Sequence, residues 1–386
     1  MNAALTAWIL RGAAIASLAL ALSSAGPVLA DDSEVNVNIP DTSPVKLDLS
    51  TAELQAKWKA RIQSFLDRGV VPLVGMESTL PYTDAKPFPQ AALTAMDRLG
   101  VALVAFDAYA AANTKKYRWS YYLEPVVNAH PDRVIPVANT GHNKSWLLQK
   151  PKKPAGYAQT LKEHMQAGDY PMMGEFEFRH YLSIAQCHAG KTKRDVDIPI
   201  DGPDGRFLFK LSSATGKAFL MHLEPEDDKV AALDRMLTEF PDAHPIWAHF
   251  GQLRHPESQK GFTADRVRAL IAAHPNLMFD LATGAPNADY NCGAEHVHGD
   301  TIIWAKGPGG QRSTLDPAFA KLLADDSQHF VAAMDYGHGR PPLASWMGEK
   351  VKNLRLILHG LPEEAQKNIG YRNAWRVLTG SDWSGG

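Results

Sequence analysis

The sequence predicts an α/β fold, a (β/α)₈ TIM barrel in which parallel strands alternate with helices. Short apolar runs, each long enough for one buried strand, occur eight times after residue 69. Most are almost continuously apolar, as expected for parallel strands that are covered on both faces. Helical patterns separate most of these runs, and this alternation is typical of a barrel.

The elements can be assigned in chain order. A first helix begins near Thr51, which can cap it, and Gly69 ends it. Strands are predicted at Val70–Gly75, Val101–Phe106, Val134–Ala138, Met172–Phe176, Ala218–Leu223, Pro245–His249, Leu277–Leu281 and Phe330–Met334. Helices are predicted at Gln90–Leu99, Ser120–Ala129, Tyr157–Ala167, Asp227–Phe240, Ala264–Ala273 and Pro317–Asp325. A doubly wound open sheet is the competing architecture, but no GxGxxG or GxxxxGK[ST] turn supports its nucleotide-binding version.

Residues 1–30 have the pattern of a secretory signal peptide. Arg11 supplies a positive charge, an apolar run extends from Ile15 to Leu22, and Ala30 precedes two aspartates. We therefore expect cleavage after Ala30 and a periplasmic or secreted protein. An uncleaved anchor is the alternative, which the short apolar run disfavours. Residues 31–50 are polar and predict a flexible leader, so the barrel domain is expected over residues 51–386.

Composition limits the partners. The formal net charge is -2, which gives no basic surplus for nucleic acid, and no later run is apolar enough to cross a membrane. We therefore expect a small-molecule substrate and no membrane contact after signal cleavage, whereas the oligomeric state stays open. Cys187 and Cys292 are the only cysteines. A secreted protein allows a disulfide between them or two free thiols, and without a CxxC pair we expect no cysteine-bound zinc.

Five acidic or imidazole residues lie at or just after the ends of apolar runs: Glu175, His222, His249, Asp280 and Asp335. In a parallel barrel the C-terminal ends of the strands meet at one face, where active sites form. Taken singly, each residue also has a structural explanation, such as an ion pair, a helix cap or a hydrogen-bonded core histidine. Two histidines that end successive strands favour a metal site, because neutral imidazole binds Zn²⁺ and several transition metals.

Several segments resemble the amidohydrolase-related family. They are HLEPEDD at 222–228, FPDA at 240–243, IWAHFG at 246–251, ILHGLP at 357–362 and KNIGYRNA at 367–374. The likeness extends from about Val70 to Leu378 and is strongest after His222. It implies a metal-centred barrel with ligands at the ends of strands one, four, five, six and eight.

Carried over residue by residue, the resemblance implies that Glu175, His222, His249 and Asp335 bind metal and that Asp335 is also catalytic. At strand one the family has His-x-His, whereas this chain has GMEST at 75–79. We therefore expect a single divalent metal, Zn²⁺ before Mn²⁺, with three protein ligands and an open position. Glu77 replaces a lost ligand or binds substrate, and Arg254 is a further candidate for substrate binding.

The resemblance implies a metal-dependent hydrolase that cleaves an ester, lactone, amide or phosphoester bond with a metal-activated water. Two alternatives stay open. One is a non-oxidative decarboxylase of the same family, and the other is a catalytically degenerate barrel that acts as a binding protein. Arg179 and His180 follow the fourth strand and are candidates to contact an anionic group. The pair His296 and His298 lies in a glycine-rich connection without obvious partner ligands.

Overall fold

The computed structural model describes residues 47–81, 84, 88–108, 119–138, 157–190, 192–253, 261–286, 290–291, 298–337 and 340–385. All of them belong to one compact unit, Asp32–Gly386. The predicted signal peptide and residues 31–46 of the predicted leader lie outside the described residues. Among the helices that are described, none has the length and apolar character needed to span a membrane.

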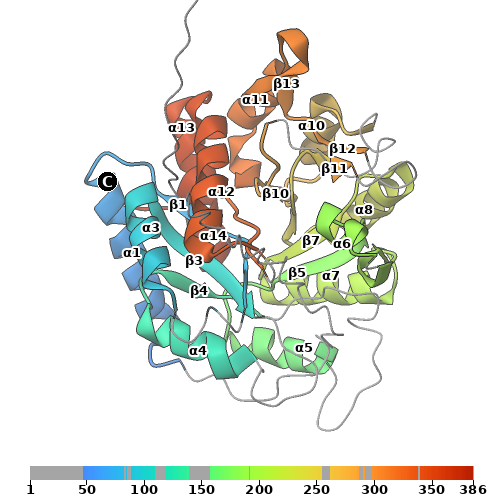
Figure 1. Ribbon diagram of the computed structural model, residues 1–386. Coiled ribbons are helices and arrows are strands. Elements are labelled where there is room, and N and C mark those ends of the chain that lie inside the picture. Colours follow the sequence, from blue (N-terminus) through green and yellow to red (C-terminus); the bar gives the residue numbers. More distant parts are fainter. Residues whose placement is uncertain are drawn as a thin grey trace, which may run out of the picture. The chain divides into compact units, whose positions relative to one another are not determined.

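Eight parallel strands form a barrel in the described part of the chain (Figure 1). They are β1 (Leu73–Gly75), β3 (Val101–Ala108), β4 (Val134–Pro136), β5 (Glu175–His180), β7 (Phe219–Leu223), β8 (Pro245–Trp247), β10 (Met278–Asp280) and β15 (Phe330–Val331). Hydrogen-bonded neighbours follow chain order from β1 to β4 and again from β5 to β15. Parallel bridges Ala138–Met173 and Ser78–Tyr336 join the two sheets and close the ring. The predicted (β/α)₈ barrel is therefore confirmed.

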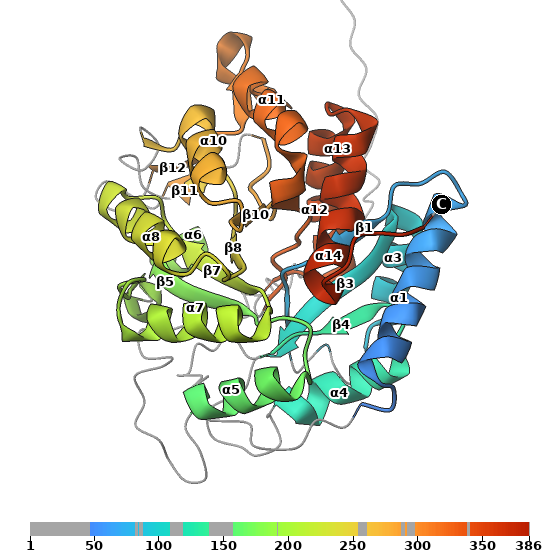
Figure 2. The same ribbon diagram turned by 180° about the vertical axis from the view of Figure 1, so that it is seen from behind.

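Helices surround these strands (Figures 1 and 2). They are α1 (Thr51–Leu66), α3 (Gln90–Leu99), α4 (Trp119–Ala129), α5 (Tyr157–Ala167), α7 (Pro203–Thr215), α8 (Asp227–Glu239), α10 (Ala264–Ala273), α11 (Pro317–Asp325), α12 (Leu343–His359), α13 (Glu363–Lys367) and α14 (Asn373–Thr379). The predicted cap at Thr51 is wrong by one residue. Ser50 caps α1, because its side chain accepts from the Glu53 N–H while the Glu53 carboxylate accepts from the Ser50 N–H. The end of the predicted leader is thus ordered by the helix that follows it.

The fourth barrel strand differs from the prediction. It was expected at Met172–Phe176 with Glu175 at its end, but β5 begins at Glu175 and continues to His180. The extension is mostly polar, and it stays in the sheet because Glu177 and Arg179 pair parallel with β7 while Arg179 and His180 pair antiparallel with the edge strand β6 (Val196–Asp197). Glu175 therefore lies at the start of its strand.

Both long connections contain secondary structure. Residues 179–217 include α6 (Ile184–His188), β6 and α7. Residues 283–315 include the short strands β11 (Tyr290–Asn291), β12 (His298–Thr301), β13 (Trp304–Lys306) and β14 (Arg312–Leu315). Strand β12 pairs antiparallel with β9 (Gln252–Leu253), which follows His249 closely. The second connection is therefore anchored next to one of the candidate ligands.

An aromatic cluster fixes the strands that carry much of the site. The Phe279 ring stacks on Trp247 with centroids 5.6 Å apart and on Phe330 at 5.6 Å. Phe250 meets Phe330 edge to face at 5.1 Å. These rings come from β8, the turn after it, β10 and β15, and burying one such side chain contributes roughly 1.5–3 kcal/mol. The strand ends that hold His249, Asp280 and Asp335 are thereby held in register.

Candidate metal centre

Two imidazoles converge on one carboxylate. His222 Nδ1 lies 3.0 Å from Glu175 Oε1, and His249 Nε2 lies 3.2 Å from the same oxygen. One ligand atom from each of these residues falls within 4.8 Å of the others. The three side chains are nearly buried and come from β5, β7 and the turn after β8. Residues separated by up to 74 positions thus form one compact donor set.

A second set shares a histidine with the first. Glu77, His249 and Asp335 also offer ligand atoms within 4.8 Å of one another. His249 Nε2 lies 3.5 Å from Glu77 Oε1, and this nitrogen has a single lone pair for coordination. The two sets therefore describe alternative positions for one cation that uses His249. Glu77, predicted either to replace a lost ligand or to bind substrate, lies among the groups that could hold the metal.

The site fits a divalent cation because it contains a buried carboxyl group whose oxygens have no hydrogen-bond partner. The Glu77 side chain is 4% exposed, and neither of its carboxylate oxygens has a hydrogen-bond partner. Burial, reinforced by the nearby carboxylates of Asp280, Glu175 and Asp335, raises the pKa of Glu77 well above its ordinary value. A buried carboxylate without compensation is costly, and carboxylate and imidazole donors suit Zn²⁺ and Mn²⁺.

The electrostatics of Glu175 differ from those of Glu77. Burial alone would raise the pKa of Glu175, but hydrogen bonds from His222 and His249 and the charges of both rings hold it well below its usual range. Glu175 is therefore an ionised acceptor between two imidazoles. A cation at this position would replace the ring protons as the partner of the carboxylate.

The His249 ring is held in a defined orientation. Its backbone lies in the left-handed region with φ 60°, and its N–H donates to Asp280 Oδ1 at 2.9 Å. Nδ1 lies 3.3 Å from the Ala282 carbonyl oxygen. A proton on Nδ1, donated to that carbonyl, leaves the lone pair on Nε2, as is usual for metal-binding histidines.

Asp335 is the second site residue with a left-handed backbone, at φ 46°. Its N–H donates to the Glu77 carbonyl at 2.9 Å, which ties it to the segment that follows β1. Asp335 Oδ2 lies 3.0 Å from Arg340 and 4.0 Å from Lys350 Nζ. Burial opposes ionisation, but the charges of Arg340, His249 and Lys350 lower the pKa of Asp335 below its ordinary value.

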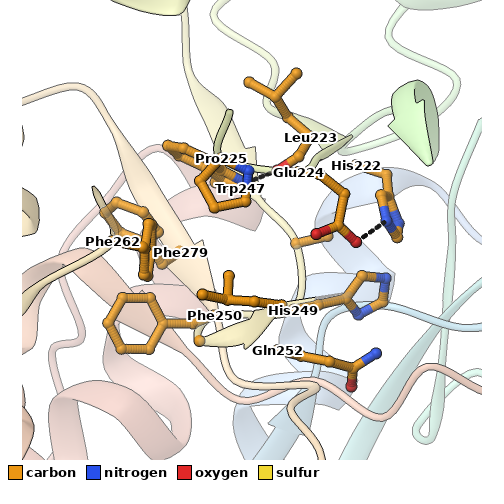
Figure 3. A pocket seen from close by; sticks show the side chains of 13 residues that line it. His222, Leu223, Glu224, Pro225, Trp247, His249, Phe250, Gln252, Phe262 and Phe279 are labelled. Carbon is orange, nitrogen blue, oxygen red and sulfur yellow. Dashed lines mark hydrogen bonds and ion pairs between the residues drawn. The ribbon is translucent and has the colours of Figure 1, made fainter. Parts of the chain in front are cut away.

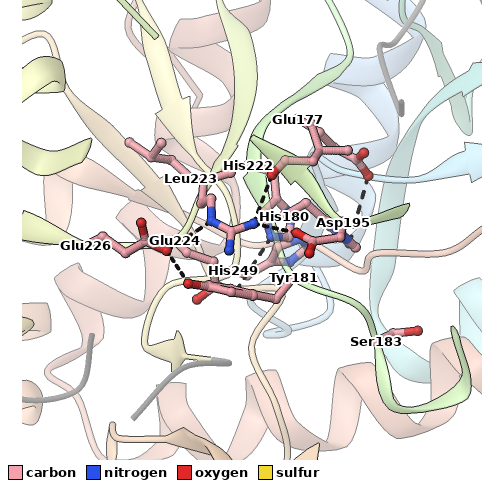
Figure 4. Close-up of polar contacts among 12 residues, drawn as sticks. Glu177, His180, Tyr181, Ser183, Asp195, His222, Leu223, Glu224, Glu226 and His249 are labelled. Carbon is pink, nitrogen blue, oxygen red and sulfur yellow. Dashed lines mark hydrogen bonds and ion pairs between the residues drawn. The ribbon is translucent and has the colours of Figure 1, made fainter. Parts of the chain in front are cut away.

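His180 and Lys350 lie close to the candidate ligands, although neither was predicted as part of the metal site. The His180 ring is buried, with its centroid 4.5 Å from that of His222, and its Nδ1 lies 2.8 Å from the Arg194 carbonyl (Figure 4). The guanidinium of Arg179, considered for an anionic group, instead contacts Asp195 at 2.7 Å and Glu226 at 2.9 Å. Lys350 lies on α12, where its sequence context is that of an ordinary helical surface residue.

A pocket adjoins the centre (Figure 3). His222, Glu224, His249 and Gln252 line its polar part, and aromatic rings including Trp247, Phe250, Phe262 and Phe279 line the rest. The candidate ligands therefore border a small cavity with both polar and apolar walls.

Other predicted residues fall outside this description. Arg254, Cys292 and His296 lie outside the described residues, as does the side chain of His298. Cys187 is disulfide-bonded, and Cys292 is the only other cysteine in the sequence.

Neither a protein-family model nor a curated protein matches the sequence. Similar solved structures include amidohydrolase-family enzymes. A 2,6-dihydroxybenzoate decarboxylase, complexed with 2,6-dihydroxybenzoate, is 12% identical, with 80% of this chain and 99% of that chain covered and a TM-score of 0.44. Amidohydrolase 2 from Bifidobacterium longum subsp. infantis is 13% identical, with 79% and 98% covered and a TM-score of 0.38. An endoxylanase retrieved from a sugarcane soil metagenome is 9% identical, with 76% and 99% covered and a TM-score of 0.36. Likenesses at this level do not select a reaction.

Proposed function

We propose that this chain is a metal-dependent hydrolase of the amidohydrolase type, which cleaves an ester, lactone, amide or phosphoester bond with an activated water. The observation that carries this proposal is the convergence of His222 Nδ1 and His249 Nε2 on one oxygen of Glu175, 3.0 and 3.2 Å away. The buried carboxyl group of Glu77, neither of whose oxygens has a hydrogen-bond partner, supports it. Zn²⁺ suits the two imidazoles, and Mn²⁺ is the alternative because carboxylates also surround the site.

In this mechanism Glu175, His222 and His249 would hold the cation, with Glu77 beside them. A bound divalent cation would polarise the scissile group and lower the pKa of a water molecule toward neutrality. Asp335 accepts a proton from the attacking water at its carboxylate and passes it to the leaving group. Arg340 and Lys350 favour the ionised form of Asp335, so this acceptor is available at neutral pH.

Non-oxidative decarboxylation is the second candidate. The cationic groups of Arg340 and Lys350 flank Asp335, and cations at this position would also attract a substrate carboxylate. The two reactions are distinguished by incubating metal-loaded protein with esters, lactones, amides, phosphoesters and hydroxybenzoates. Release of carbon dioxide without hydrolysis of any panel member would replace the hydrolase proposal by the decarboxylase proposal.

Metal analysis tests the shared premise. Purified protein is treated with chelator, reloaded with zinc or manganese and analysed by mass spectrometry of the metal. We expect about one metal per chain in the wild type and loss of that metal in the H222A H249A variant. The matched control is H274A, because His274 is also buried but pairs with Asp234 at 2.7 Å outside the centre. A wild type that binds no metal would favour the degenerate, non-catalytic barrel.

We also propose that residues 1–30 direct export and are removed. The support is the pattern of charge, apolar run and small residue in the sequence. Mass spectrometry of protein from the culture medium and the periplasm tests this directly. The expected mature N-terminus is Asp31, and an intact Met1 on exported protein would contradict cleavage.

A further inference from the structure

Asp280 occupies an unusual position between two backbone segments. It is the last residue of β10 and is fully buried. One oxygen, Oδ1, accepts both the His249 N–H at 2.9 Å and the Ala282 N–H at 3.0 Å. The other oxygen, Oδ2, has no hydrogen-bond partner. The carboxylate therefore joins the turn after β8 to the turn after its own strand.

These bonds control His249 at both its backbone and its ring. The backbone of His249 has φ 60°, a conformation that is uncommon for residues other than glycine and needs support from its surroundings. Asp280 supplies that support through Oδ1, and its own carbonyl accepts the Phe250 N–H at 3.0 Å. Ala282, held by the same Oδ1, presents the carbonyl that lies 3.3 Å from His249 Nδ1.

We infer that Asp280 is a positioning residue that fixes the His249 imidazole so that Nε2 faces the cation. The inference rests on the proposed function, because it assumes that His249 is a metal ligand. Asp280 belongs to neither of the candidate ligand sets, so its effect passes through His249. The part that matters is the acceptor oxygen, which an asparagine side chain would reproduce without the charge.

Substitution at this position separates the acceptor from the charge. We expect D280N to bind Zn²⁺ and Co²⁺ within about threefold of the wild type and to keep the visible spectrum of the cobalt-loaded protein. D280A removes the acceptor, and we expect its affinity for both ions to fall about 10–100-fold, as for other groups that orient metal ligands, with a changed cobalt spectrum. D204A is the matched control, because Asp204 is a buried aspartate of α7 outside the candidate ligand sets, and it should leave the cobalt spectrum unchanged.

The outcomes distinguish this inference from the proposed function. A wild type that binds neither ion overturns both. A wild type that binds cobalt, together with a D280A variant of equal affinity and unchanged spectrum, overturns only the role of Asp280. If D280A does not fold, D280N decides: an intact cobalt spectrum supports positioning through hydrogen bonds. A loss in D280N as large as that in H249A shows instead that the charge of Asp280 is what matters.

Discussion

Replacing Glu77 by glutamine should make the metal-free protein more stable and the metal-loaded protein less stable. Glu77 is 4% exposed, and its carboxylate accepts no hydrogen bond. Three other carboxylates act on it unfavourably, those of Asp280, Glu175 and Asp335. Glutamine has nearly the same size but no charge, and its amide can donate to neighbouring carboxylates. In the absence of metal the substitution therefore removes the free-energy cost of keeping an ionisable carboxyl group among three others, and in the presence of metal it removes a charged donor.

The magnitude follows from the burial. Leaving a buried polar group unsatisfied costs about 1–3 kcal/mol, and more for a charged group. Since the glutamine amide must itself find partners, we expect a net gain of about 1–2 kcal/mol in the free energy of unfolding without metal. One kcal/mol corresponds to a change in Tm of about 2–4 °C for a large domain. With metal, a tenfold weaker Kd removes about 1.4 kcal/mol of the stabilisation that binding gives.

The assay is thermal unfolding of wild type and E77Q in excess EDTA and in saturating zinc. We expect E77Q to have the higher Tm in EDTA and the smaller rise in Tm on addition of zinc. The control is D204N, because burial also raises the pKa of Asp204 but this residue belongs to neither candidate ligand set. D204N should shift Tm equally in both conditions. An E77Q variant that is less stable than the wild type in EDTA would show that Glu77 has a structural role, and the reasoning would fail.

Three other measurements test the fold and its response to pH. F279A should lower the free energy of unfolding by about 3–5 kcal/mol, because this fully buried ring stacks between Trp247 and Phe330. Urea denaturation measures this loss, and a value below about 1 kcal/mol would contradict the packing. S50A should cost about 1 kcal/mol in the same assay, because the Ser50 side chain accepts from the Glu53 N–H, whereas S64A, on the exposed side of α1, should change little. Burial lowers the pKa of His244 below its ordinary value of about 6.5, so the unfolded chain takes up a proton there at a higher pH than the folded chain. The contribution of His244 to the free energy of unfolding is therefore complete above about pH 6.5 and is lost as the pH falls toward the folded pKa. Urea midpoints at pH 7.5 and 5.5 should differ less in H244Q than in the wild type. Equal differences would refute this pH dependence of His244.

The barrel could be predicted because its strands occur in the sequence as apolar runs. Strands such as β7 and β8 are buried on both faces, so their sequences contain little besides hydrophobic residues before His222 and His249. The two histidines stood out for the same reason, as polar residues that interrupt a hydrophobic pattern. Local sequence was sufficient wherever the interior of the barrel is apolar.

Prediction failed where the interior is polar. Glu175 was placed at the end of its strand because the charge at that point ended the apolar run, whereas the chain continues as β5 to His180. That continuation depends on pairing with β7 on one side and β6 on the other, which sequence pattern does not show. The approach of Lys350 to Asp335, and the hydrogen bonds of Asp280 to His249, depend on helix and turn placement that no local motif records.

Among the described residues other than glycine, His249 and Asp335 have left-handed backbones, and this has a consequence for protein engineering. Glycine adopts such conformations readily, so selection for thermal tolerance alone would favour discarding both side chains. A library screened only for heat resistance should therefore accumulate variants that are thermostable but catalytically inactive. Selection for turnover must be applied together with the thermal screen.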